Sequence, residues 1–315
     1  MNGLELSRAY YEAFGKEMIH NDFPALEGIV AVGLVGEGSE CFGFDDEVSR
    51  DHDFGPRFCL FLPDSETLVS SRLEFQLERA YAKLPREFEG FVREKTSPVG
   101  GARDGVMRIG AFYEKFIGAP SAPEYLIDWL NIPEHFLATA TNGAVFRDDE
   151  GTFSRIRQSL SQYPEDVWKK KLAAVLLQMN KSGQYNYRRC LQHGETCAAQ
   201  LCVTEFCRAA RRAAFLFNHT FEPYYKWAHR AMRALPKFSD FSETIEFLLT
   251  SPNDEDLADI KSDTMETIAI SYIEELQRRG LTRAVCTDLE KHAYSLNDTI
   301  ADPDLRNLNL FFALD

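Results

Sequence analysis

The feature that most constrains the fold is a pair of short apolar runs near the N-terminus, each next to a distinctive turn. Residues 29–35 (Ile-Val-Ala-Val-Gly-Leu-Val) are flanked by glycine and are typical of a buried strand. They lead into Gly36-Glu37-Gly38-Ser39, where glycine permits the positive φ and the close backbone approach of a tight turn. After eleven further residues, Asp51-His52-Asp53 precedes a second apolar run, 54–62. This order predicts a first domain built on a sheet.

The two turns carry residue types suited to phosphate and metal binding. A strand that ends in Gly38-Ser39 and opens a helix would present backbone N–H groups, a hydroxyl and a helix N-terminus to an anion. Asp51 and Asp53 are separated by one residue, so at a strand edge both carboxylates point the same way. Mg²⁺ prefers oxygen ligands and commonly uses one or two carboxylates together with substrate phosphates. This pair can therefore hold Mg²⁺ bound to a triphosphate.

The rest of the first half alternates between helical and strand patterns. Residues 4–20 and 70–84 have the apolar spacing of helices, the second of them stopped by Pro85. Further expected elements are strands at 88–93, 106–109 and 143–147 and a helix at 111–117. We expect this α/β domain to span residues 1–150, with the boundary near Asp148-Asp149-Glu150-Gly151.

The second half, residues 151–315, changes to helical periodicity. Trp168, Leu172, Val175, Leu176 and Met179 fall on one face of a helix. Further helical segments are expected at 197–217, 223–235, 241–249, 254–279 and 288–294, with few β-rich runs between them. The predicted fold class is therefore α+β: an N-terminal mixed sheet with flanking helices, followed by an all-α helical bundle.

Composition narrows the setting of the chain. Its 315 residues suit two domains, and no run of about 18 apolar residues predicts a membrane span. Charged residues interrupt the first 16 positions, unlike a secretory signal, and the seven cysteines are scattered without the spacing of a disulfide framework. These features favour a cytoplasmic protein. A net charge of −14 argues against general affinity for nucleic acid or anionic membranes.

Positive charge is concentrated in one segment. Between Arg155 and Leu235 there are 14 basic and five acidic residues, a local net charge of +9. Arg208, Arg211 and Arg212 share one side of a helix, and Lys226, Arg230 and Arg233 repeat that spacing on the next. One interpretation is that these side chains line solvated helix faces and pair with acidic residues elsewhere. The other is that some of them bind a phosphate-bearing ligand.

Gly-Ser, a spacer of about ten residues and an acid-x-acid pair together resemble the nucleotidyltransferase superfamily, which includes kanamycin and lincosamide nucleotidyltransferases. The stretch 38–57 is more similar to a bacterial family of unknown function with this core, and the resemblance continues through 129–148, 163–164 and 212–227. It implies that Gly38 and Ser39 contact nucleotide phosphates and that Asp51 and Asp53 bind Mg²⁺. Arg212 and Lys226 match the family pattern, and it implies that they reach the triphosphate from the helical domain.

The superfamily usually adds a third carboxylate on a later strand, as metal ligand or general base. Glu89 and Glu94 lie on or just after one expected strand and Asp148 ends another, but none of them lies in a distinctive motif. The resemblance therefore supports two functional hypotheses. One is a Mg²⁺-dependent enzyme that moves a nucleoside monophosphate from an NTP to an acceptor, with a small, cationic molecule favoured over bulk nucleic acid because the chain is acidic. The other is a catalytically degenerate nucleotide-binding or interaction protein on the same fold.

Overall fold

The computed structural model describes residues 1–48, 54–93 and 103–314. The chain is α+β, with a small mixed sheet in its first half and a helical C-terminal region. Its described residues form two compact units. We call Met1–Ala122 with His135–Ser161 the sheet unit, and Pro123–Glu134 with Gln162–Asp315 the helical unit. In the part of the chain described, no helix has the length and apolar character needed to cross a membrane.

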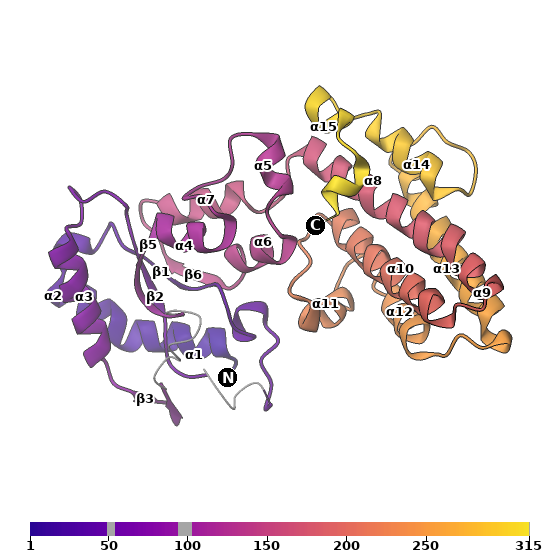
Figure 1. Ribbon diagram of the computed structural model, residues 1–315. Coiled ribbons are helices and arrows are strands. Elements are labelled where there is room, and N and C mark those ends of the chain that lie inside the picture. The colour runs from indigo at the N-terminus through magenta and orange to yellow at the C-terminus, as the bar shows by residue number, and fades with distance from the viewer. Residues whose placement is uncertain (49–53, 94–102, 315) are drawn as a thin grey trace. The chain divides into compact units, whose positions relative to one another are not determined.

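The sheet has four strands in the order β5-β2-β1-β6. β1 (Ala31–Leu34) lies antiparallel to β2 (Cys59–Leu62) and to β6 (Ala144–Arg147), whereas β2 and β5 (Gly105–Arg108) run parallel. In the β2–β5 register, Cys59 lies opposite Gly105. The residues that precede β2 and those that precede β5 therefore meet at the same edge of the sheet. This edge is where the candidate site is built (Figure 1).

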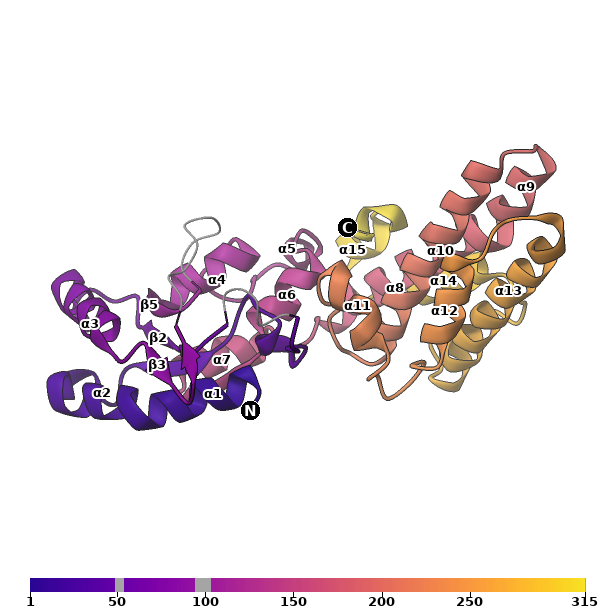
Figure 2. The ribbon, with the colours of Figure 1, turned by 90° about the horizontal axis from the view of Figure 1, so that it is seen from below.

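Helices cover both faces of this sheet. The remaining elements of the sheet unit are α1 (Gly3–Tyr10), a π-helical segment (Tyr11–Gly15), α2 (Lys16–Asp22), α3 (Ser71–Lys83), the hairpin strands β3 (Glu87–Phe88) and β4 (Phe91–Val92), α4 (Ile109–Ile117) and α7 (Thr152–Ser159). A further helix, α6 (Glu134–Ala140), begins at the boundary between the units. Figure 2 shows α1 and α2 on one side of the strands and α4 on the other.

Alternating side chains of β2 explain this layering. Leu60 and Leu62 share a buried cluster with Tyr10 of α1 and Leu77 of α3. Phe61 points the other way, stacking on Phe153 of α7 at 4.2 Å between ring centroids. A strand with both faces covered needs apolar residues at every position, which is why β2 reads as a continuous apolar run.

The helical unit packs around one apolar cluster to which α8, α10, α12, α13 and α14 contribute. The longest helices are α10 (Thr196–Phe217) and α13 (Glu255–Arg278). The other helices that lie in this unit are α5 (Leu126–Leu130), α8 (Glu165–Met179), the π-helical segment Asn180–Asn186, α9 (Tyr187–Gln192), α11 (Tyr225–Met232), α12 (Phe241–Thr250), α14 (Leu289–Asn297) and α15 (Pro303–Asn307). In Figure 1, α8 and α10 run side by side through this unit.

The helices expected from periodicity at 197–217, 241–249, 254–279 and 288–294 are confirmed to within three residues at either end. Asp254 and Asp288 cap the last two, because each side chain accepts a backbone N–H of the first turn. β2 is shorter than the expected strand at 54–62. Pro56 cannot donate to a neighbouring strand, and regular pairing begins only at Cys59.

The sequence boundary at residue 150 and the division into units differ at two places. Residues 123–134 group with the helical unit, and 151–161 group with the sheet unit. The second difference has a visible cause, because Phe153 of α7 packs on Phe61 of the sheet.

Candidate functional site

A glycine-containing loop, Val35–Ser39, follows β1. Gly36 and Gly38 have φ values of 103° and 129°, which residues other than glycine rarely adopt. A Cβ on Gly38 would also lie 2.5 Å from the carboxylate of Glu40. The Asn142 side chain accepts the Gly36 N–H and donates to the Gly36 carbonyl, each at 2.8 Å. The loop conformation is thus permitted by its glycines and held by two hydrogen bonds to a distant residue.

The expectation that Gly38-Ser39 opens a helix is wrong. Only a three-residue 3₁₀ turn, Glu40–Phe42, follows Ser39. Gly43 ends it in the left-handed conformation at φ 69°, with no continuing amphipathic run. Any anion bound by Gly38 and Ser39 would therefore depend on loop groups and nearby cations, because there is no helix dipole.

A buried ion pair joins this loop to the segment that enters β2. Arg57 donates to the carboxylate of Glu40, and each residue is 5% exposed. Phe54 also lies close to Glu40, because both side chains surround Gly3. A Cβ added to Gly3 would lie 2.4 Å from Glu40 and 3.2 Å from the Phe54 ring. Asp51 and Asp53 themselves lie outside the described residues. The residue that follows Asp53 is nevertheless packed beside Glu40, the neighbour of Ser39.

The start of β5 adds a carboxylate that the sequence reasoning missed. Asp104 lies opposite Phe58 in the parallel β2–β5 pairing, and the Gly105 N–H donates to the Phe58 carbonyl at 3.0 Å. The Tyr81 hydroxyl donates to Asp104 Oδ2 at 2.7 Å and accepts the Phe58 N–H at 3.2 Å. Asp104 is thus fixed at the sheet edge by its backbone and by its side chain.

The signal for Asp104 was present in the sequence. Asp104 stands two residues before Val106, the first residue of the apolar strand expected at 106–109, and Asp53 stands directly before the run 54–62. Glu89, Glu94 and Asp148 instead lie on, after or at the end of expected strands. Because β2 and β5 are parallel, the positions comparable with Asp53 are those that precede β5.

The three carboxylates suggested from sequence lie elsewhere. Glu89 is exposed at the tip of the β3–β4 hairpin, with a positive φ of 53°. Asp148 accepts the Ser154 N–H at 2.7 Å, a local contact at the start of α7. Glu94 lies outside the described residues.

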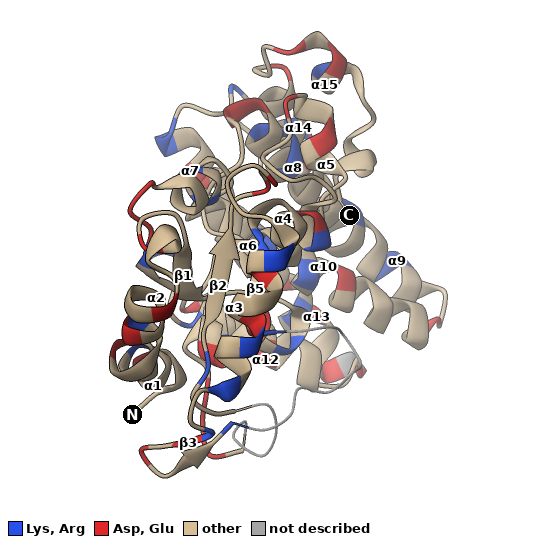
Figure 3. Cartoon of the chain, turned by 90° about the vertical axis from the view of Figure 1, so that its left-hand side faces the viewer, with Lys and Arg blue, Asp and Glu red and all other residues tan. Residues whose placement is uncertain are grey.

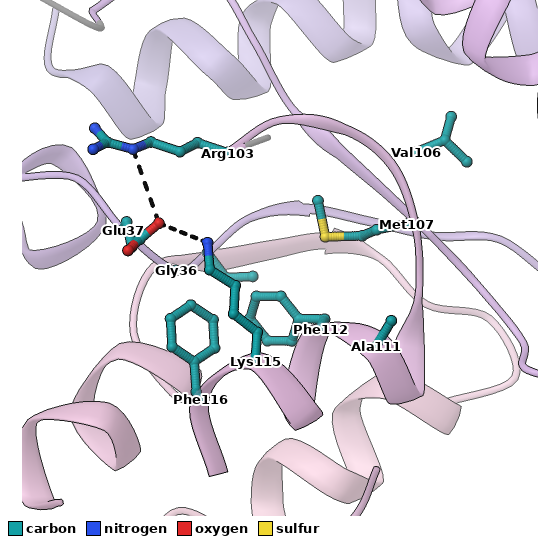
Figure 4. A pocket seen from close by; sticks show the side chains of 10 residues that line it. Gly36, Glu37, Arg103, Val106, Met107, Ala111, Phe112, Lys115 and Phe116 are labelled. Carbon is teal, nitrogen blue, oxygen red and sulfur yellow. Dashed lines mark hydrogen bonds and ion pairs between the residues drawn. The ribbon is translucent and has the colours of Figure 1, made fainter. Parts of the chain in front are cut away.

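A pocket of about 150 Å³ opens beside the loop (Figure 4). Its floor is apolar, with Met107, Phe112 and Phe116 among its residues. Glu37 bridges two cations there: its Oε2 lies 2.7 Å from Lys115 Nζ and 3.9 Å from Arg103 Nε. The remaining lining residues are Val35, Gly36, Val106 and Ala111.

Two thiols of this region are unsuited to nucleophilic chemistry. Burial raises the pKa of Cys59 to about 12, and burial also raises the pKa of Cys41 well above its ordinary value. Both therefore remain protonated near neutral pH. The chemistry available here comes from carboxylates, cations and backbone groups.

Arg212, expected to bind phosphate, has buried partners inside the helical unit. Its side chain is 14% exposed, lies 3.5 Å from Glu134 and donates to the Leu314 carbonyl. Neighbouring Arg211 pairs with Glu222, whose backbone N–H donates to Glu134 at 3.0 Å. Burial raises the pKa of Glu222. These four side chains form one buried network, which we call the Arg212 network.

Lys226 lies in a different environment. It is exposed at the start of α11, and its Nζ lies 4.4 Å from the centroid of the Trp227 ring. Several cations of the basic segment have acidic partners, among them Lys169 with Glu165, Lys181 with Glu290 and Arg233 with Glu246, which fits the interpretation of this segment as partly paired. Figure 3 shows acidic and basic positions interspersed along the chain in the view it gives.

Within residues 1–48, 54–93 and 103–314, no group of three or more His, Cys, Asp or Glu side chains is arranged to hold a metal ion. Asp51 and Asp53, which the sequence assigns to Mg²⁺, are not among those residues. Asp104 lies within them and supplies one oxygen-donor carboxylate.

A family model described as a domain of unknown function, DUF4037, matches residues 129–228. The match covers less than half of the chain and runs from α5 into α11, so it includes Arg212 and Lys226. No curated protein and no solved structure matches the chain.

Proposed function

We propose that the chain is a Mg²⁺-dependent nucleotidyltransferase that moves a nucleoside monophosphate from an NTP to a small acceptor. The observation that carries the proposal is the position of Asp104. It directly precedes β5, whose first residue Gly105 pairs with Cys59 of β2, and in the sequence Asp51 and Asp53 precede that same β2. The resemblance to nucleotidyltransferases implies a third carboxylate on a later strand, and Asp104, directly before β5, is our candidate for it.

The residues suit Mg²⁺ by their chemistry. Asp51, Asp53 and Asp104 are all carboxylates, and Mg²⁺ takes oxygen ligands from few protein groups while keeping contacts to phosphates. Bound there, Mg²⁺ would neutralise charge on the triphosphate. The glycines of the Val35–Ser39 loop allow a phosphate to approach the backbone closely.

The proposed reaction forms a bond from an acceptor hydroxyl oxygen to the α-phosphorus and breaks the bond from that phosphorus to the bridging oxygen. Pyrophosphate leaves with that oxygen, and the hydroxyl proton passes to a base. Asp104 is our candidate for the base, because it has a fixed carboxylate at the sheet edge. The hydrogen bond from Tyr81 orients this carboxylate.

The acceptor we favour is a small cationic molecule such as an aminoglycoside-like compound. The net charge of −14 would attract it and repel bulk nucleic acid. A cytoplasmic setting is part of the same proposal, since NTPs are found there.

A second candidate is a nucleotide-binding protein without turnover. The missing helix after Ser39 favours it, because the loop provides no helix dipole for the triphosphate. Both candidates require Mg²⁺-dependent NTP binding, and only the enzyme releases pyrophosphate.

The test is pyrophosphate release with each of the four NTPs, Mg²⁺ and a panel of amino-sugar and other hydroxyl acceptors. Wild type should release pyrophosphate with at least one acceptor, and the double variant Asp51→Asn, Asp53→Asn should release none. Glu89→Gln, at the exposed hairpin tip, is the matched control and should behave as wild type. NTP binding without release over the whole panel would favour the second candidate, and no NTP binding would exclude both.

A further inference from the structure

The pocket beside the Val35–Ser39 loop contains a charge cluster that the proposed reaction does not use. Glu37 comes from the loop, Arg103 precedes β5, and Lys115 lies on α4. One carboxylate oxygen of Glu37 lies between the two cations, as the dashed lines of Figure 4 show. Two positive side chains from separate elements thus converge on one oxygen atom.

The Glu37 carboxylate can leave its two cationic partners at a small cost in free energy. The side chains of Glu37 and Lys115 are 38% and 39% exposed, and such accessible pairs contribute at most about 1 kcal/mol. The backbone next to Glu37 is held by Asn142, so its side chain can rotate without moving the loop. Breaking the Glu37–Lys115 ion pair therefore costs little free energy.

The surroundings favour a replacement anion. Phe112, Phe116 and Met107 line the floor of the pocket, and an apolar wall strengthens electrostatic attraction at its mouth. Glu37 is followed by Gly38 and Arg103 is followed by Asp104, so two residues of the pocket are direct sequence neighbours of the proposed nucleotide site. The nearest anion of a bound NTP would be its polyphosphate chain.

We propose that Arg103 and Lys115 bind the oxygens of a polyphosphate and that the Glu37 carboxylate occupies their site when no ligand is present. Glu37 is then a built-in competitor that the ligand must displace. The identity of the ligand rests on the proposed function. The competition itself is a property of this pocket and can be measured with pyrophosphate alone.

The experiment is calorimetric titration of pyrophosphate into the full chain without divalent metal. Glu37→Gln removes the competing charge at constant shape and should raise affinity about two- to fivefold, the value of an exposed ion pair. Lys115→Ala and Arg103→Ala should each lower affinity, and Arg103→Lys should restore part of the loss. Lys83→Ala, an exposed lysine at the end of α3, removes the same charge elsewhere and should leave affinity unchanged.

Thermal melts of every variant check that the chain still folds. Equal or weaker pyrophosphate binding by Glu37→Gln would overturn the competition, and a Lys115→Ala variant that matches Lys83→Ala would overturn the site. If the variants change pyrophosphate affinity as expected but wild type transfers no nucleotide, this inference stands and the enzyme proposal fails. If wild type transfers nucleotide but all variants bind pyrophosphate equally well, the enzyme proposal stands and this inference fails.

Discussion

Two charge clusters of similar composition differ sharply in their environment. In the sheet unit, Glu37 holds Arg103 and Lys115 at the mouth of a pocket, with side chains 28–39% exposed. In the helical unit, the Arg212 network pairs two arginines with two glutamates whose side chains are 5–14% exposed. Both clusters join acids and bases that are distant in sequence, but only the first lies open to solvent.

The difference teaches how burial decides the role of a cation. A charge in the interior cannot be left alone, because desolvation costs several kcal/mol unless a partner compensates it. Arg212 is therefore committed to Glu134 and the Leu314 carbonyl. Lys115 can exchange Glu37 for another anion at little cost. The predictions below test this contrast.

The largest effect is expected for Arg212→Ala. It leaves Glu134 buried without its cation and the Leu314 carbonyl without this donor, so the free energy of unfolding should fall by about 3–5 kcal/mol. Urea unfolding followed by circular dichroism measures this. Arg208→Ala, on the same helix but 61% exposed, is the control and should cost under about 0.5 kcal/mol. Equal losses in both variants would show that burial does not separate these arginines.

An intermediate effect is expected for Glu275→Gln in α13. Side-chain hydrogen bonds from Arg278, Lys237 and Arg279 hold the pKa of Glu275 well below its usual range. Its stabilising contribution is therefore present above the ordinary glutamate pKa and is lost as pH falls toward the lowered value. The variant should be about 2 kcal/mol less stable than wild type at pH 7.

The gap between wild type and Glu275→Gln should shrink as the pH is lowered below about 4.5. There the Glu275 carboxylate is protonated in the unfolded chain, while the folded state, with its lowered pKa, keeps it ionised. Thermal unfolding between pH 3 and 7 follows this change. Glu274→Gln, one position earlier and exposed, should show no such pH-dependent gap. A gap that stays constant with pH would contradict the assigned cause.

The smallest effect on stability is expected for Glu37→Gln. Because this ion pair is exposed, its loss should change the free energy of unfolding by less than about 1 kcal/mol. The same variant should bind pyrophosphate more tightly than wild type. A loss as large as that of Arg212→Ala would make the cluster structural and remove the contrast between the two regions.

The sequence predicts elements best where periodicity is local. The helices around Asp254 and Asp288 follow from apolar spacing and an acidic cap, both of which lie within a few residues. β1 likewise follows from a continuous apolar run. The helix expected after Ser39 was wrong because no apolar periodicity supports one and Gly43 ends the turn.

The site was harder to predict because its parts meet only through topology. Asp104 becomes a neighbour of Phe58 through the parallel pairing of β2 and β5, which a single sequence does not reveal. The burial and pairing of Arg212 depend on Glu134, which lies 78 positions earlier in the chain. Helical spacing places Arg208, Arg211 and Arg212 on one side of α10, yet only tertiary packing decides which of them is buried.

The most direct test of the central claim is the Mg²⁺ dependence of NTP affinity in Asp104→Asn. The asparagine oxygen can still accept the Tyr81 hydroxyl, so the variant should fold. Calorimetry with the preferred NTP should show that Mg²⁺ raises the NTP affinity of wild type and of Glu89→Gln. In Asp104→Asn this Mg²⁺-dependent increase should be at least about tenfold smaller, a loss of about 1.4 kcal/mol. Its affinity without Mg²⁺ should be no weaker than that of wild type, because the substitution removes a negative charge. An Asp104→Asn variant that keeps the full Mg²⁺-dependent gain would contradict the proposed nucleotide–metal site.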